Sequence, residues 1–252
     1  MHRANVQRAM SGTIALVGSG EYTNAMNTTD RYLLDTISSV RKKRVVILPT
    51  ASGLEQGMPQ RWNNMGVKHF EALDAEVTPV MLVTREDANN PKVAAAIRHA
   101  DLYYFSGGNP QYVVETLRDT PAWDALVDGY EQGAVLAGCS AGAMMLGSYT
   151  LNVRAAVSGQ PPQWTPAFGL VPGLAVLPHF DRITAFIEPD TFQQMLASAP
   201  EGIVVIGVDE DTALVRHTAP DQSNWIIMGQ QTVSVFRDGE RVVYQAGATL
   251  DL

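Results

Sequence analysis

The stretch that most constrains the fold covers residues 134–147 and reads AVLAGCSAGAMMLG. Its first four residues are apolar and indicate a short buried strand, and the small residues after it suit a helix. Between them, residues 138–142 have the spacing Gly-x-Ser-x-Gly. At a strand-to-helix turn this spacing presents a serine hydroxyl at the carboxyl end of a buried strand. The stretch therefore predicts an α/β fold with Ser140 as a candidate nucleophile.

Two features of this turn bear on its chemistry. The N–H of Ala141, at the start of the helix, is placed to receive negative charge on a substrate oxygen. Cys139 is the only cysteine of the chain. Neighbouring side chains at such a turn point to opposite sides, so we interpret Cys139 as a small buried packing residue. A glycine-rich turn that only connects two elements, or that cradles a phosphate, is the alternative to the nucleophile.

Short apolar runs alternate with amphipathic segments over the first 147 residues. We expect strands at 13–17, 45–48, 76–83, 101–105 and 134–137, and helices at 29–40, 62–73, 90–99, 111–117 and 123–132. This alternation predicts a doubly wound, mostly parallel sheet covered on both faces. Such a sheet collects its sites outside the carboxyl ends of its strands. The turns that contain Gly18, Gly107 and Gly138 fall at that edge.

The pattern changes after residue 147. We expect strands at 153–158, 175–177, 204–208 and 213–215, a helical region at 183–198 interrupted near Pro189, and C-terminal antiparallel strands at 225–228, 232–236 and 241–245. Asp238-Gly239 is a favourable hairpin turn between the last two strands. The acidic run Asp209-Glu210-Asp211 is interpreted as a turn at a strand end. Residues 13–252 are expected to form one α/β domain, and residues 1–12 a flexible tail.

Composition narrows the classes of function. A chain of 252 residues with 46% hydrophobic and 17% charged residues fits a single large domain. The formal net charge of −8 argues against a nucleic-acid partner, which would require a basic surface. No apolar run is long enough to span a membrane, and the N-terminus lacks the apolar segment of a signal peptide, so the cytoplasm is the expected location.

No cofactor is expected from the motifs. The turn at residues 18–20 has the spacing Gly-x-Gly but lacks the third glycine of a dinucleotide site. Histidine, cysteine and acidic residues show no ligand spacing, so no metal is expected either.

A serine hydroxyl needs a base to take its proton. Of the five histidines, His179 alone follows a short apolar strand at an expected carboxyl edge of the sheet and comes after Ser140 in the chain. The other four lie on helical faces, after a late strand or in the N-terminal tail. His179 is therefore the candidate base. Asp181 and Arg182 beside it are candidate substrate contacts, or else the polar start of a helix.

A second glycine turn, at residues 107–108, is expected at the same edge of the sheet as Ser140. Its backbone N–H groups, Gly108 above all, could provide a second oxyanion donor that complements Ala141. Asn109 and Gln111 would then contact polar groups of the substrate. The alternative is a glycine turn that only lets the chain leave its strand.

Four segments carry a resemblance to a known family: 105–111 (FSGGNPQ), 138–144 (GCSAGAM), 178–182 (PHFDR) and 207–215 (GVDEDTALV). In this order they resemble the cyanophycinase and aspartyl dipeptidase (dipeptidase E) family of serine peptidases, over about residues 14–245. The resemblance implies a class I glutamine amidotransferase-like, flavodoxin-like fold. It also implies a nucleophilic serine, here Ser140, and a catalytic histidine, here His179.

The same resemblance implies an acid between these two residues, yet no Asp or Glu occurs from position 140 to position 179. We assign the third position to Asn152, whose amide oxygen could orient the imidazole. Gln160 and Glu21 are the alternatives.

The sequence thus predicts a serine peptidase-like hydrolase that cleaves a peptide or isopeptide bond in a small peptide. A binding homologue without the acid, and an esterase or acyl-transfer enzyme, remain open, as does a homodimer.

Overall fold

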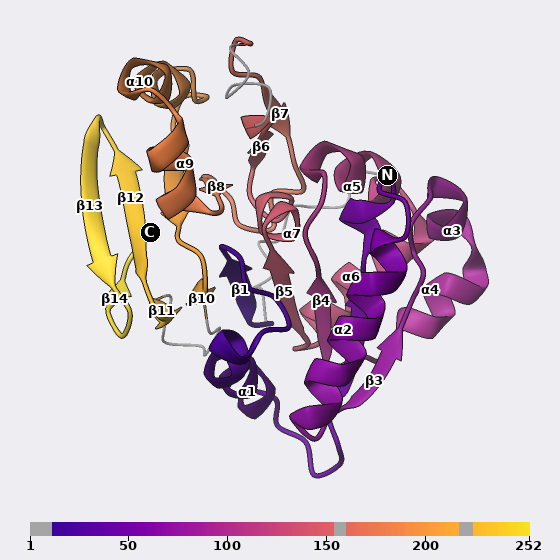
Figure 1. The fold of residues 1–252 in the computed structure, drawn as a ribbon. Helices are drawn as coiled ribbons and strands as arrows, with labels where there is room; N and C mark the ends of the chain where they lie inside the picture. Colours follow the sequence, from indigo (N-terminus) through magenta and orange to yellow (C-terminus); the bar gives the residue numbers. More distant parts are fainter. Residues whose placement is uncertain (1–11, 154–159, 217–223) are drawn as a thin grey trace, which may run out of the picture.

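The computed structural model in Figure 1 describes residues 12–153, 160–216 and 224–252, which form a mixed α/β fold with two sheets. The larger sheet has the strand order β14-β11-β10-β1-β5-β4-β2-β3. Its strands are β1 (Ile14–Val17), β2 (Arg44–Leu48), β3 (Glu76–Pro79), β4 (Leu102–Phe105), β5 (Val135–Cys139), β10 (Thr212–Arg216), β11 (Trp225–Gly229) and β14 (Thr249–Leu250).

The smaller sheet has the strand order β13-β12-β9-β8-β6-β7. Its strands are β6 (Tyr149–Leu151), β7 (Trp164–Pro166), β8 (Leu174–Leu177), β9 (Val204–Val208), β12 (Thr232–Arg237) and β13 (Glu240–Gln245). The helices are α1 (Asn27–Asp35), α2 (Met58–Ala72), α3 (Arg85–Asn89), α4 (Pro91–Ile97), α5 (Pro110–Leu117), α6 (Pro121–Glu131), α7 (Ala141–Met144), α9 (Phe180–Phe186) and α10 (Pro189–Ala197), with 3-10 turns η1 (Asn24–Met26) and η2 (Thr50–Ser52).

The predicted parallel sheet is confirmed over β1, β5, β4, β2 and β3, which pair in parallel with their neighbours. Successive side chains of β1 enter two separate cores, because side chains alternate between the faces of a strand. Ala15 and Val17 pack with α1 and α2 on one face, and Ile14 and Leu16 pack with α4, α5 and α6 on the other. Burial on both faces explains why these strands read as continuous apolar runs.

Proline fixes where three of these helices begin. Asn90, Asn109 and Thr120 each precede a proline, and each caps its helix by accepting a hydrogen bond from a backbone N–H of the first turn. Proline suits the first helical position because its missing N–H has no partner there in any case. The starts of α4, α5 and α6 therefore follow from local sequence.

The later strands are divided between the two sheets. β10 pairs antiparallel with β1 and so ends the parallel part of the larger sheet, whereas β8 and β9 pair with each other in the smaller sheet. The predicted C-terminal antiparallel strands are confirmed, but they divide: β11 joins the larger sheet, and the hairpin of β12 and β13 joins β9. One hydrophobic core is common to both sheets, since Ile206 of β9 packs in the same cluster as Leu214 of β10.

Several predicted boundaries can be compared directly. The helical region at 183–198 is two helices, and it is interrupted at Pro189 as expected. Asp238 and Gly239 both have positive φ angles, of 53° and 81°, as the predicted hairpin turn requires. The strand expected at 153–158 and the tail expected at 1–12 lie almost entirely outside the described residues. Across the described ranges, no helix is long and apolar enough to cross a membrane.

Candidate active site

The elbow predicted at residues 138–142 joins β5 to α7. Ser140 adopts φ 54° and ψ −115°, a strained conformation for a residue with a side chain. The turn is so tight that a Cβ atom added at Gly138 would lie 2.2 Å from the carbonyl oxygen of Gly142. A glycine at position 138 is therefore what allows the chain to reverse here and present the Ser140 hydroxyl.

This contact gives a prediction for Gly138→Ala. We expect the added methyl group to force the elbow apart and to lower the free energy of unfolding by about 1–3 kcal/mol, the usual cost of overpacking. Labelling of Ser140 by a fluorophosphonate should fall in the protein that remains folded. Thermal unfolding followed by circular dichroism, together with the labelling rate, tests this. Unchanged stability and unchanged labelling would contradict it.

Three glycine turns meet at the carboxyl edge of the sheet, because β1, β5 and β4 are neighbours there. The N–H of Ser140 donates to the carbonyl oxygen of Val17 at 2.9 Å. The N–H of Gly107, after β4, donates to the Glu21 carboxylate of the β1 turn at 3.0 Å. The three turns thus lie together outside the carboxyl ends of parallel strands, where such sheets collect their sites.

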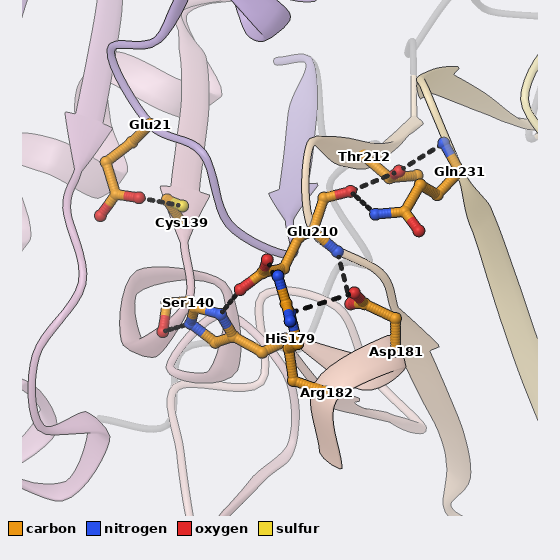
Figure 2. Close-up of polar contacts among 9 residues, drawn as sticks. All are labelled: Glu21, Cys139, Ser140, His179, Asp181, Arg182, Glu210, Thr212 and Gln231. Carbon is orange, nitrogen blue, oxygen red and sulfur yellow. Dashed lines mark hydrogen bonds and ion pairs between the residues drawn. The ribbon is translucent and has the colours of Figure 1, made fainter. Parts of the chain in front are cut away.

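His179 reaches the serine from the other sheet. It lies between β8 and α9 with a left-handed backbone conformation (φ 50°, ψ 38°), and its N–H donates to the carbonyl oxygen of Gly18 at 3.3 Å. Its Nε2 atom is 3.0 Å from Oγ of Ser140, as Figure 2 shows. The predicted nucleophile and the predicted base are therefore within hydrogen-bond distance.

The partner of the other ring nitrogen is a carboxylate that sequence reasoning missed. Nδ1 of His179 lies 3.0 Å from Oε1 of Glu210, in the turn between β9 and β10. The hydrogen bond to His179, followed by one to Arg182, lowers the pKa of Glu210 despite its partial burial. Glu210 is thus ionised at neutral pH and can orient the imidazole and stabilise its protonated form.

Neighbouring groups hold Glu210 in place (Figure 2). Its N–H donates to Oδ1 of Asp181 at 2.9 Å, and its Oε2 accepts from Nε of Arg182 at 3.2 Å. Its carbonyl oxygen accepts from Nε2 of Gln231 at 2.9 Å and from Oγ1 of Thr212 at 3.0 Å. Of the two residues expected as substrate contacts, Asp181 thus accepts from the backbone of Glu210, and Arg182 donates to the carboxylate that faces His179.

The structure therefore differs from the expected third position. Nδ1 of His179 faces Glu210, whereas Asn152 lines the cavity beside Ser140. Glu21 is engaged elsewhere, with the N–H of Gly107 and the thiol of Cys139. Glu210 was missed because the acid was sought between the serine and the histidine. The available signal was an acidic run directly after the apolar strand 204–208, which was interpreted as a plain turn.

Cys139 is fully buried on the opposite side of the turn from the cavity. Burial, and then the nearby Glu21 carboxylate, raise the pKa of its thiol well above the ordinary value. A thiol kept protonated is a poor nucleophile. This agrees with the interpretation of Cys139 as a packing residue.

Two backbone N–H groups flank the serine. Gly108 and Ala141 both line the cavity, and within the described part of the chain neither N–H donates a hydrogen bond. The next N–H, of Asn109, donates to the carbonyl oxygen of Ala51 at 2.7 Å. Gly108 has φ +147°, and a Cβ atom there would lie 2.2 Å from that same oxygen, so the position requires glycine. The two free N–H groups fit the predicted oxyanion donors.

The cavity above Ser140 has a volume of about 200 Å³. Apolar side chains form one part of its wall, and the amides of Asn109, Gln111 and Asn152 another. The Asn109 amide oxygen already caps α5 by accepting from two backbone N–H groups. Nε2 of Gln111 lies 3.4 Å from Oγ1 of Thr165, at the limit of a hydrogen bond. The amide of Gln111 is thus only weakly engaged within the described residues, and it lines the cavity.

Serine hydrolases use this arrangement of three side chains. A serine lies on a strained turn, a histidine contacts its hydroxyl, and a carboxylate contacts the other ring nitrogen of the histidine. The profile of Peptidase family S51 matches residues 14–220, and the chain belongs to this family. This confirms the resemblance to the cyanophycinase and dipeptidase E group.

Known proteins agree with this assignment. A peptidase from an acI-B1 Actinobacterium, known from its crystal structure, is 33% identical with a TM-score of 0.85, over 97% of this chain and 98% of that one. A putative peptidase E protein from Listeria monocytogenes EGD-e shares the fold, at 17% identity and a TM-score of 0.57 over 94% and 99% of the two chains.

An uncharacterized peptidase of Bacillus subtilis (strain 168), YgaJ, is 28% identical over 136 residues, which are 54% of this chain and 56% of that protein. The match thus spans about half the length of this relative.

Proposed function

We propose that this protein is a serine peptidase that cleaves a peptide or isopeptide bond in a small peptide. The observation that carries the proposal is the line of contacts from Ser140 Oγ to His179 Nε2 and from His179 Nδ1 to Glu210 Oε1, each 3.0 Å long. Membership of Peptidase family S51 supports the reaction class. The fold alone would not, because one fold serves many chemistries.

In the proposed acylation, Oγ of Ser140 attacks the carbonyl carbon of the scissile bond, and Nε2 of His179 takes the hydroxyl proton. The carbonyl oxygen gains negative charge and is received by the N–H groups of Gly108 and Ala141. Glu210 stabilises the imidazolium through Nδ1. The C–N bond then breaks, the imidazolium gives its proton to the leaving amine, and an acyl ester remains on Ser140.

In the proposed deacylation, a water molecule takes the place of the amine. His179 removes one proton from the water as its oxygen attacks the ester carbon, and the same two N–H groups hold the second oxyanion. The C–O bond to Ser140 breaks, His179 returns its proton to the serine oxygen, and the carboxylic acid leaves. Each proton taken by His179 is returned, so no co-reactant other than water is needed.

The size of the cavity supports a small substrate. Its volume of about 200 Å³ lies below the usual range for drug-sized ligands, so it suits one or two amino-acid residues. Asn109, Gln111 and Asn152 are proposed to contact the substrate's polar groups. The side chain of Arg182 is largely exposed, and its Nε contacts Glu210. Its Nη groups are proposed as a further contact for a carboxylate of the substrate.

A substrate panel tests the proposal. We expect purified protein to release amines from one group of dipeptides or isopeptides, and to be labelled at Ser140 by a fluorophosphonate. Aryl esters, tested in parallel, separate a peptidase from an esterase, because an esterase would cleave the esters and leave every peptide intact. The alternative of a non-catalytic binding homologue depends on the absence of an acid between Ser140 and His179. Glu210 supplies an acid from a later segment. Absence of labelling would favour that homologue nonetheless.

A further inference from the structure

Glu21 is a buried carboxylate that the proposed reaction does not use. It lies in the turn after β1, and only 7% of its surface is exposed. Its Oε1 accepts the N–H of Gly107 at 3.0 Å, and its Oε2 accepts the thiol of Cys139 at 2.9 Å. Gly107 and Cys139 directly precede Gly108 and Ser140, the proposed oxyanion donor and nucleophile. One side chain therefore joins the three turns that form the site.

The Gly107–Gly108 segment needs such a restraint. Two consecutive glycines have no Cβ atoms to limit rotation, so the peptide group between them can turn over at low cost. If it turned, the carbonyl oxygen of Gly107 would replace the N–H of Gly108 at the oxyanion position and repel the developing charge. A preformed donor contributes to catalysis because it needs no reorganisation when the reaction occurs.

The contacts hold this peptide from both sides. The N–H of Gly107 is fixed by Glu21, and the N–H of Asn109 is fixed by the carbonyl oxygen of Ala51 at 2.7 Å. The N–H of Gly108, between them, is left without an acceptor in the described residues. The segment also lies against the elbow, since a Cβ atom added at Gly107 would be 3.3 Å from Cβ of Ser140.

We propose that Glu21 is a positioning residue that holds the Gly107–Gly108 peptide with the Gly108 N–H directed at the oxyanion. The proposal rests on the proposed function of Ser140. Oε2 of the same carboxylate accepts from Cys139 in the elbow, as the dashed line in Figure 2 shows. Loss of Glu21 should therefore affect the transition state and leave the binding of the substrate's ground state intact.

The experiment compares Glu21→Ala, Glu21→Gln and Glu21→Asp by the rate of fluorophosphonate labelling of Ser140. The labelled adduct has an oxygen in the oxyanion position, and no peptide substrate is needed. We expect Glu21→Ala to label on the order of 10²-fold more slowly, as for the loss of one oxyanion donor. Glu21→Gln should stay within about tenfold of wild type, because its amide oxygen can still accept the Gly107 N–H. Glu21→Asp keeps the charge, but its side chain is too short to reach the Gly107 N–H. Its labelling rate should therefore resemble that of Glu21→Ala.

Asp30→Ala is the matched control. Asp30 is a fully buried carboxylate whose Oδ2 lies 2.7 Å from Nε2 of His69, and among the described residues it makes no hydrogen bond to Gly107 or Cys139. We expect it to lower the melting temperature and leave the labelling rate unchanged. With a peptide substrate, the folded Glu21 variants should show a reduced kcat and a KM within about threefold of wild type.

Four results would overturn the proposal. Two concern labelling: folded Glu21→Ala is labelled at the wild-type rate, or Asp30→Ala is slowed as much as Glu21→Ala. The third is a raised KM with unchanged kcat in the Glu21 variants, and the fourth is fast labelling of Glu21→Asp with slow labelling of Glu21→Gln, which would show that the charge of the side chain matters and its length does not. If Glu21→Ala fails to fold, the order of the other two variants still decides. Wild-type protein that is labelled but cleaves no peptide would end the proposed function and leave this test intact. Wild-type protein that is not labelled would end both.

Discussion

Ser140→Ala is expected to lower kcat for peptide hydrolysis by a factor on the order of 10⁶, the typical cost of removing the nucleophile of a serine–histidine pair. Stability should change little, because the serine side chain contacts His179 across the cavity and is not part of a core. The strained turn itself remains, since the backbone is unchanged. The measurement is kcat on a cleaved dipeptide, with thermal unfolding as the test of folding.

Cys139→Ala is the control for this change, because it removes the other candidate nucleophile one residue away. The Cys139 thiol is buried against Glu21 and kept protonated, so we expect its loss to leave kcat within about tenfold of wild type. Activity of Ser140→Ala within tenfold of wild type would refute the role of Ser140. A severe loss in Cys139→Ala alone would assign the nucleophile to the thiol.

The parts of the site that the sequence predicted are those encoded locally. The Gly-x-Ser-x-Gly spacing requires a turn that any chain with this strand and helix must make, so Ser140 and Ala141 could be placed from a dozen residues. The glycine turn at 107–108 could be placed because parallel strands end at one edge. A proline is also the first residue of α4, α5 and α6, so these starts are encoded locally, although the starts expected at 111 and 123 lie one and two residues too late.

The parts that were not predicted depend on pairing between distant segments. The apolar run of β9 does not indicate whether this strand pairs with β8 or extends the larger sheet. Buried strands of either sheet have the same apolar composition. The turn that holds Glu210 lies between β9 of the smaller sheet and β10 of the larger. The Glu210 carboxylate, in this turn between the sheets, can reach His179 only because the two sheets share one core. No local sequence pattern reveals that shared core.

Glu210→Gln is the second substitution with a large expected effect, a fall in kcat of about 10⁴ with little change in KM. A carboxylate accepts a hydrogen bond from the Nδ1–H of His179, which leaves Nε2 unprotonated and able to take the serine proton. A glutamine amide can instead turn its NH₂ group toward Nδ1. The ring then carries its proton on Nε2, so the nitrogen that faces Ser140 can no longer take the serine proton. The loss should appear in the rate of fluorophosphonate labelling as well as in kcat.

Asp209→Asn provides a matched change from carboxylate to amide one residue earlier. Asp209 is buried and its Oδ2 bonds Thr232, at 3.1 Å from the backbone N–H and 2.6 Å from the hydroxyl, so it acts away from the site. We expect Asp209→Asn to reduce stability and to leave kcat of the folded protein within about threefold of wild type. An equal loss of activity in the two variants would mean that the turn at 209–211 is structural and that Glu210 has no special role.

The pH dependence of stability gives an independent test of the same carboxylate. The hydrogen bond to His179 lowers the pKa of Glu210, so the stabilisation it contributes is complete above the ordinary pKa of a glutamate and is lost as pH falls through the lower, folded-state pKa. The difference in free energy of unfolding between wild type and Glu210→Gln should therefore be largest near neutral pH and shrink on the acid side. Urea unfolding at a series of pH values measures it. A difference that stayed constant, together with kcat above a tenth of wild type, would show that Glu210 does not hold the imidazole in its working tautomer.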